Sequence, residues 1–317
     1  MSLARAAGLG VRGVIRRGLF LLLLACAPGL AVAAPVRVVL SDDAAPYQEV
    51  FEALRTQLAA RDVSVERVYA DAPSDAATAA RLWVVVGVRA AEAVANWRGR
   101  TPVLAVLVPR DWYLKTGRAR LAGAERRPVS AIYLDQPFER QARLIRLAFP
   151  GAKKVGVLLS PGQAGLADEI EAALRGQGLG LVAEIVSSEQ KLVEPLERVF
   201  TAADVLLAVP DPEIFNRSTA QTILLTSYRY RDPMVGYSQS LARAGAMLSL
   251  YSTPAQIGRQ AAEVVVRALE APHGRLPPPE APAEFTLSIN RQVARSLGFD
   301  LPPESELLRR LQGGGDD

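Results

Sequence analysis

The sequence predicts an α/β protein made of two doubly wound lobes, each built on a parallel sheet, with a hinge between them. Short runs rich in Val, Ile and Leu recur between amphipathic segments, which is typical of buried parallel strands joined by crossover helices. This order of strands and helices begins again after residues 135–140. No long flexible linker separates the two halves of the sequence, so we expect the lobes to lie together and to define a cleft.

The first lobe is predicted to span residues 34–136. Two segments with apolar residues at helical spacing, 47–60 and 89–97, lie between its apolar runs. We predict its strands at 36–40, 63–69, 82–87, 102–107 and 129–134.

The second lobe is predicted to span residues 137–251, with helices at 167–177, 192–200 and 215–229. Its strands are expected at 154–160, 179–186, 204–210, 233–238 and 245–251.

The C-terminal region contains one more helix and one more strand. We predict a helix at 254–270, a stiff proline-rich connection at 277–282 and a strand at 283–289. We assign residues 252–300 to the first lobe and residues 301–317, which end in QGGGDD, to a C-terminal tail.

Residues 1–33 have the pattern of a secretory signal peptide. Four arginines precede the apolar run at 19–25, the pair Pro28-Gly29 breaks it, and the small residues at 31–33 form a cleavage site. The apolar run is shorter than the roughly 20 residues that a membrane-spanning helix needs. We therefore expect export to the periplasm.

Cys26 leaves a second processing route open. The segment LLAC resembles the lipobox at which bacterial lipoproteins are cut and acylated, so a lipid on Cys26 is the alternative to cleavage after Ala33. Cys26 is the single cysteine of the chain, so the exported domain is expected to fold without disulfides.

The composition argues against nucleic-acid binding and against most kinds of catalysis. Four of the 37 basic residues and none of the 33 acidic residues lie in the signal peptide, so the exported chain is electrically balanced. His273 is the single histidine, which disfavours a histidine triad or a histidine-rich metal site, and we expect no enzyme activity, metal or other cofactor. A glycosidase using two of Asp42, Asp43, Asp111 and Asp211 stays formally open.

Ligands of doubly wound sheets bind beyond the carboxyl ends of the strands, and this rule selects the candidate binding residues. Several have a structural alternative: Ser41 and Asp211 can cap helices, Arg89 can face solvent, and strand-end tyrosines can pack between lobes. The candidates are Ser41, Asp42, Arg89, Arg110, Ser160, Asp211, Tyr237 and Tyr251.

Residues 129–270 resemble the substrate-binding proteins of ABC transporters, in particular the members that bind aromatic amino acids. Three stretches carry the resemblance: QARLIRLAFPGAKKVGVLLSP at 141–161, ADVLLAVPDPEIFN at 203–216, and the most specific, 233–269. The resemblance implies the type I periplasmic-binding-protein fold, in which two Rossmann-like lobes are joined by three crossings and close on the ligand. The crossings would fall near 135–139, 251–255 and 277–283, and we expect the last strand and helix to return to the first lobe.

The same resemblance implies a function. The protein would be a monomer that captures a small polar solute, an amino acid or a small anion, and delivers it to an inner-membrane ABC permease. Its first lobe departs from the family pattern, because Gly87-Val88-Arg89 and Pro109-Arg110-Asp111 replace the usual Gly-Thr or Gly-Ser and Asp-Pro-Val turns. Arg89 or Arg110 would then grip an anion. A periplasmic sensor or interaction module without a permease, and an envelope hydrolase, are the alternatives.

Overall fold

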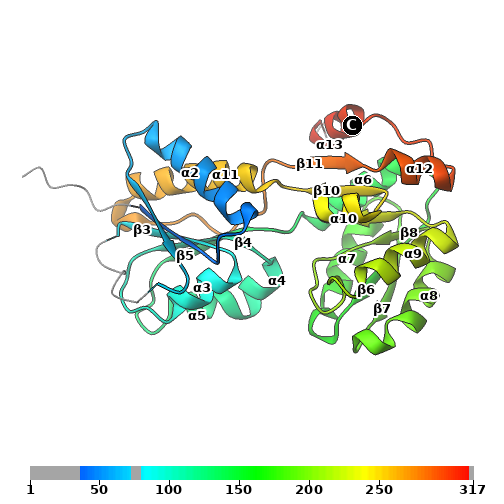
Figure 1. Ribbon diagram of the computed structural model, residues 1–317, viewed down its shortest axis with the longest axis horizontal. Coiled ribbons are helices and arrows are strands. Elements are labelled where there is room, and N and C mark those ends of the chain that lie inside the picture. Colours follow the sequence, from blue (N-terminus) through cyan, green and yellow to red (C-terminus); the bar gives the residue numbers. More distant parts are fainter. Residues whose placement is uncertain (1–35, 73–79, 314–317) are drawn as a thin grey trace, which may run out of the picture. The chain divides into compact units, whose positions relative to one another are not determined.

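The computed structural model describes residues 36–72 and 80–313 (Figure 1). The predicted signal peptide, Cys26 and residues 314–317 lie outside the described residues. In the described part of the chain, no helix is both long and apolar enough to cross a membrane. The described strands form two separate sheets.

The first sheet is parallel throughout, and its strand order is β2-β1-β3-β4-β5. Every residue of its central strand β3 is buried, which explains the uninterrupted apolar run LWVVV. The strands are β1 (Val36–Leu40), β2 (Val65–Tyr69), β3 (Leu82–Val86), β4 (Val103–Val108) and β5 (Val129–Tyr133).

Helices cover both faces of this sheet. On one face, α2 (Ala45–Ala59) and α11 (Pro254–Glu270) pack with strand residues such as Leu40. On the other, α3 (Val88–Ala95) and α5 (Arg118–Ala122) pack with residues such as Val39. Successive side chains of a strand point to opposite faces, so one apolar run supplies both cores.

Helices α2 and α11 approach each other closely at Gly258. A Cβ atom at this position would lie 2.6 Å from the carbonyl oxygen of Val50 and 2.8 Å from the side chain of Ala53. Only glycine fits there without a shift of the backbone. This contact attaches α11, which follows the second lobe in sequence, to the first sheet.

The second sheet has the order β11-β10-β9-β8-β6-β7, and all its pairs are parallel except β10 with β11. Together with the first sheet, it confirms the predicted α/β class with two parallel-dominated sheets. Its strands are β6 (Lys154–Leu159), β7 (Gly180–Ile185), β8 (Val205–Leu207), β9 (Met234–Gly236), β10 (Leu248–Tyr251) and β11 (Thr286–Ile289).

Two groups of helices enclose the second sheet. One core contains α6 (Phe138–Ala148), α7 (Leu166–Arg175), α12 (Arg291–Leu297) and α13 (Glu304–Gln312). The other contains α8 (Val193–Ala202), α9 (Ala220–Tyr230) and α10 (Gln239–Ala244). Both faces of this sheet are therefore also buried.

The prediction that the last strand returns to the first lobe is wrong, because β11 pairs antiparallel with β10 in the second sheet. The chain leaves the first sheet after β5, returns to it with α11, and leaves it again before β11. A chain that begins on the first sheet and crosses three times must end on the second. Residues 283–300 therefore do not belong to the first lobe.

The assignment of residues 301–317 to a tail is also wrong for its described part. Residues 304–312 form α13, which packs against α6, and Leu307 and Leu311 are buried in the core of the second sheet. Its sequence ESELLRRLQ carries one apolar stripe, which gains its stability from this packing. Strand β11 and helix α13 together complete the second lobe.

Candidate ligand-binding site

A cavity of about 230 Å³ lies at the carboxyl ends of strands from both sheets. In parallel α/β sheets this edge is where ligands bind. The lining comes from the ends of β4 and β5, the start of α6, the turn and helix after β6, and the end of β8. The lining residues are Arg110, Asp111, Tyr133, Asp135, Gln136, Pro137, Phe138, Glu139, Gln163, Leu166, Glu169, Pro210 and Ala281.

An ion pair between the two lobes forms part of this lining. Arg110 starts the short helix α4 (Arg110–Trp112) after β4, and Glu169 lies in the first turn of α7. The Nη1 atom of Arg110 donates to Oε1 of Glu169 at 2.6 Å and to Oε2 at 2.8 Å. Partial burial lowers the pKa of Arg110, but the hydrogen bond and charge of Glu169 outweigh it and leave the pKa raised. The guanidinium is thus already paired with a carboxylate.

Asp135 lies two residues after the end of β5 and beside this pair. Its Oδ2 atom accepts a hydrogen bond of 2.7 Å from the backbone N–H of Arg110. Burial raises the pKa of Asp135 to about 6, and the hydrogen bond from Arg110 opposes that rise only in part. The carboxyl group therefore changes its charge close to neutral pH.

The cavity carries more negative than positive side chains. Asp111, Asp135, Glu139 and Glu169 line it, whereas Arg110 is its one lining cation among the described residues. Of the lining acids, Asp111 is also paired with a lysine outside the cavity lining, at 2.8 Å. The excess of carboxylates gives the cavity a negative potential.

A further acceptor in the cavity has no partner in the described structure. Gln163 lines the cavity, and its Nε2 atom donates to the carbonyl oxygen of Pro210 at 3.0 Å, which leaves its Oε1 atom as the free acceptor of the amide. That oxygen is buried and accepts no hydrogen bond from any described residue. Because a buried acceptor without a partner costs about 1–3 kcal/mol, a ligand donor here would be stabilising.

Asp211 and Ser160 bring together two neighbouring strand ends of the second sheet. The Asp211 carboxylate accepts from the backbone N–H of Ser160 at 3.1 Å and from that of Glu213 at 2.9 Å. Tyr237 lies close by, with its ring edge against Phe215. Burial, and then the carboxylates of Asp211 and Asp135, raise the pKa of Tyr237 to about 12. Asp211 directly follows Pro210, which lines the cavity, but Ser160, Asp211 and Tyr237 are not themselves part of the lining.

The candidates at the other strand ends of the first sheet have structural partners. The hydroxyl of Ser41 donates to the carbonyl of Val86 at 2.8 Å and accepts from the N–H of Ala90 at 3.1 Å. It thereby caps α3, whose own N-cap residue is Gly87 and has no side chain. Asp42 accepts from the N–H of Ala44 at 2.9 Å.

The remaining two candidates, Arg89 and Tyr251, also lie outside the lining of the cavity. Arg89 is exposed in the first turn of α3, and Tyr251 shares a hydrogen bond of 2.9 Å with Ser288, which joins β10 to β11. Of the eight candidates, Arg110 is the one that lines the cavity. The strand-end rule would also have found Asp135, whereas no local pattern marked Glu169 or Gln163.

A family model described as ABC transporter substrate binding protein matches residues 125–309, which is more than half of the chain. The chain belongs to this family. No curated protein shows significant sequence similarity to it. The matched region contains α6 to α12 and therefore includes the part of the cavity contributed by the second lobe.

Solved structures of the same fold cover most of this substrate-binding protein. An ABC domain from Streptococcus pneumonia in complex with L-Trp has a TM-score of 0.61 and 16% identity over 87% of this chain and 97% of that one. A conserved domain protein from Vibrio cholerae has a TM-score of 0.62 and 20% identity, with coverages of 88% and 98%. A ligand-free, open substrate-binding protein with adhesive properties from Clostridium difficile has a TM-score of 0.66 and 13% identity, with coverages of 85% and 96%. At these identities the similarity establishes the fold.

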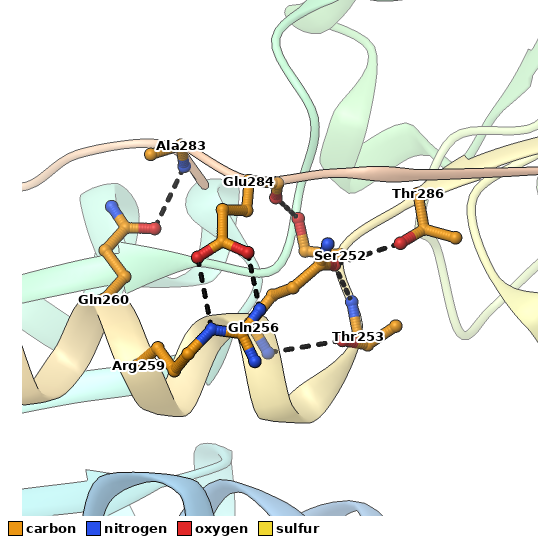
Figure 2. Close-up of polar contacts among 8 residues, drawn as sticks. All are labelled: Ser252, Thr253, Gln256, Arg259, Gln260, Ala283, Glu284 and Thr286. Atoms are coloured by element: carbon orange, nitrogen blue, oxygen red, sulfur yellow. Dashed lines mark hydrogen bonds and ion pairs between the residues drawn. The ribbon is translucent and has the colours of Figure 1, made fainter. Parts of the chain in front are cut away.

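The three crossings of this substrate-binding protein are joined by one polar chain. The Nε2 atom of Gln136, on the first crossing, donates to Oγ of Ser252 on the second at 2.8 Å. Ser252 Oγ donates in turn to the carbonyl of Glu284 on the third at 2.5 Å (Figure 2). Arg140 adds a second link, because its Nη1 atom donates to Oε1 of Gln136 and to the carbonyl of Pro282.

Helix α11 is tied to the third crossing along its first two turns. Thr253 and Gln256 form a capping box, and the Oε1 atom of Gln256 also accepts from the hydroxyl of Thr286 at 3.2 Å. Arg259 pairs with Glu284, and Gln260 accepts from the N–H of Ala283 at 2.9 Å (Figure 2). Side-chain hydrogen bonds and an ion pair therefore connect the hinge segments, in addition to the backbone.

Proposed function

We propose that this protein captures a small solute carrying a protonated amine and delivers it to an inner-membrane ABC permease. Membership of the substrate-binding family supports the transport role. The signal-like segment at residues 1–33 supports a place in the periplasm. An amino acid meets the chemical requirement, as does a simple amine.

The excess of hydrogen-bond acceptors in the cavity is the observation that supports a solute with a protonated amine. Asp135, Glu169 and Gln163 all line it, and the Oε1 atom of Gln163 is buried without a described partner. A protonated amine is a compact donor of up to three hydrogen bonds, and charge-assisted hydrogen bonds contribute about 1.5–3 kcal/mol each. A cation therefore matches both the charge and the hydrogen-bonding needs of this lining.

A small anion suits the same cavity less well. It would have to compete with Glu169 for Arg110 and would lie beside Asp135. Arg110 is better matched to the carboxylate end of a zwitterion whose amine meets the acidic lining. Among the two solute classes expected from the sequence, these contacts favour an amino acid over a free anion.

The size of the cavity favours a small solute. At about 230 Å³ it is smaller than the pockets of roughly 300–1,000 Å³ that hold drug-sized ligands. Tyr133, Phe138 and Leu166 add apolar surface to the lining. The L-Trp in the pneumococcal structure is a further reason to include aromatic amino acids among the ligands tested.

Thermal unfolding of the purified protein with single solutes tests the proposal. Amino acids and amines should raise the melting temperature, because a ligand that binds the folded state stabilises it by mass action. Chemically matched carboxylic acids without an amine should have little effect. Stabilisation by anions alone would contradict the proposal, as would no stabilisation by any amine.

Two variants of α7 make the test specific to the site. Glu169→Gln should weaken binding of the best amine by about tenfold or more, which corresponds to the loss of one charge-assisted contact. Glu171→Gln changes the same residue type on the same helix, where Glu171 pairs with the exposed Arg175, and should leave affinity unchanged. Isothermal titration calorimetry measures both, and equal losses in the two variants would count against a role for the cavity.

A further inference from the structure

A second hollow lies on the outer surface of the second lobe and shares no residue with the ligand cavity. Its volume is about 760 Å³, and it runs between α9 on one side and α10 and α12 on the other. We call it the α9 groove. It is lined by Arg217, Ala220, Gln221, Leu224, Leu225, Ser227, Tyr228, Ser240, Ala244, Gly245, Val293 and Leu297.

Helix α9 exposes two large apolar side chains along this groove. Leu225 is 59% exposed and Tyr228 is 53% exposed. Thr226 and Ser227 are buried instead, with their hydroxyls bonded to the carbonyls of Thr222 and Asp232. The third buried side chain of α9, Ile223, packs into the core of the second sheet, so that the helix has apolar side chains on both faces. The outward Leu225 and Tyr228 therefore mark a surface that a partner covers.

The three helices that form the groove carry charges of one sign. Helices α9, α10 and α12 contain no acidic residue, although acidic and basic residues are balanced over the exported chain. Arg217 lines the groove, and Arg229, Arg243 and Arg295 are exposed on its three helices. Arg217 at the groove and the arginines of its three helices thus give this part of the surface an excess of positive charge.

We propose that the α9 groove binds an amphipathic helix of a partner protein whose polar face is acidic. Leucine-type side chains of that helix would enter between Leu224, Leu225 and Val293, and its carboxylates would meet the surrounding arginines. A groove between helices matches the convex shape of a helix, which is a common mode of peptide recognition. Arg217 and the arginines of the three helices supply the electrostatic complementarity that selects this partner over a neutral or basic one.

Two other occupants match the surface less well. A second copy of the protein related by twofold symmetry would place the same patch against itself, so that arginines would face arginines. An anionic membrane would satisfy the charge but is flat, whereas the floor of Leu224, Val293 and Leu297 is recessed between helices. The shape therefore favours the acidic helix.

The probe for the test is a dye-labelled synthetic helix of roughly five turns, with Leu at i, i+3, i+4 and i+7 spacing and Glu on its other face. A control peptide has Lys in place of every Glu. Fluorescence anisotropy with the full protein should show binding of the Glu peptide that is at least about tenfold tighter than that of the Lys peptide. Equal affinities would overturn the proposal.

Variants of the protein connect the binding to the groove. Leu225→Asp should reduce the affinity for the Glu peptide by about tenfold or more, and Tyr228→Ser provides a second test should the first variant fold poorly. Leu114→Asp is the matched control, because Leu114 is 50% exposed on the first lobe, outside the groove. Unchanged affinity in both groove variants would overturn the proposal. Sedimentation with phosphatidylglycerol vesicles in the absence of peptide binding would overturn it as well, in favour of a membrane.

Discussion

The Arg110 guanidinium and the Glu169 carboxylate meet through a single nitrogen, Nη1, which lies 2.6 Å and 2.8 Å from the two carboxylate oxygens. Both side chains keep more than a third of their surface exposed. The pair lies at the edge of the ligand cavity, where solvent weakens its attraction. Its position suits an interaction that exchanges partners when a ligand enters.

We expect removal of this pair to change ligand binding much more than stability. Arg110→Ala should lower the free energy of unfolding by no more than about 1 kcal/mol, because exposed ion pairs contribute about 0–1 kcal/mol. Urea denaturation of the ligand-free protein measures this. Affinity for a zwitterionic solute should fall by about tenfold or more. A large loss of stability with unchanged affinity would assign the pair a purely structural role.

Asp135 should make stability depend on pH between about 4 and 6. Its pKa rises from 3.8 in the unfolded chain to about 6 in the folded protein, so the folded state binds the proton more tightly. This contribution is fully present below pH 3.8 and is lost as pH rises through about 6. A shift of this size corresponds to about 2–3 kcal/mol.

Asp135→Asn isolates that effect. An asparagine side chain keeps an oxygen for the hydrogen bond from the Arg110 N–H but does not ionise. The fall in stability from pH 4 to pH 6 should be smaller in this variant than in the natural protein, as measured by urea denaturation across the range. Asp232, whose pKa is also raised to about 6, is present in both proteins and cancels in the comparison. An identical pH dependence would contradict the assignment.

Two buried serines, Ser252 on the second crossing and Ser249 in β10, form a matched pair. Ser252 joins Gln136 to the carbonyl of Glu284, whereas the hydroxyl of Ser249 is buried without a described partner. Ser252→Ala should cost about 1–3 kcal/mol, because it leaves buried polar groups unpaired. Ser249→Ala should be neutral or slightly stabilising. Chemical denaturation ranks the two, and the reverse order would show that the polar chain does not stabilise the hinge.

Helix α13 should contribute to stability as a core element. Leu307 is fully buried against α6 and the second sheet, so Leu307→Ala should lower the free energy of unfolding by about 2–5 kcal/mol. Ser305→Ala on the exposed face of the same helix should have little effect. A negligible change in the Leu307→Ala variant would show that α13 does not contribute to the stability of the core.

The local sequence pattern predicts most of the strands and helices of the fold. The alternation of apolar runs and amphipathic segments marks both sheets, because burial on two faces demands continuous apolar strands. The same pattern cannot say which sheet receives an isolated strand. Both sheets have edge strands, and the pairing of β11 with β10 depends on where those edges lie in space when the chain has crossed for the third time.

The candidate site, too, could be predicted from the sequence only in part. Sequence alone determined that Arg110 follows a buried strand of the first sheet, since the position depends only on neighbouring residues. Tertiary structure decided that Glu169 and Gln163, from the second lobe, meet Arg110 and Asp135. It also decided that the Ser41 hydroxyl caps α3 and is not left for a ligand. Charge and hydrogen-bonding partners in a site come from segments distant in the chain, and only folding brings those atoms within reach of one another.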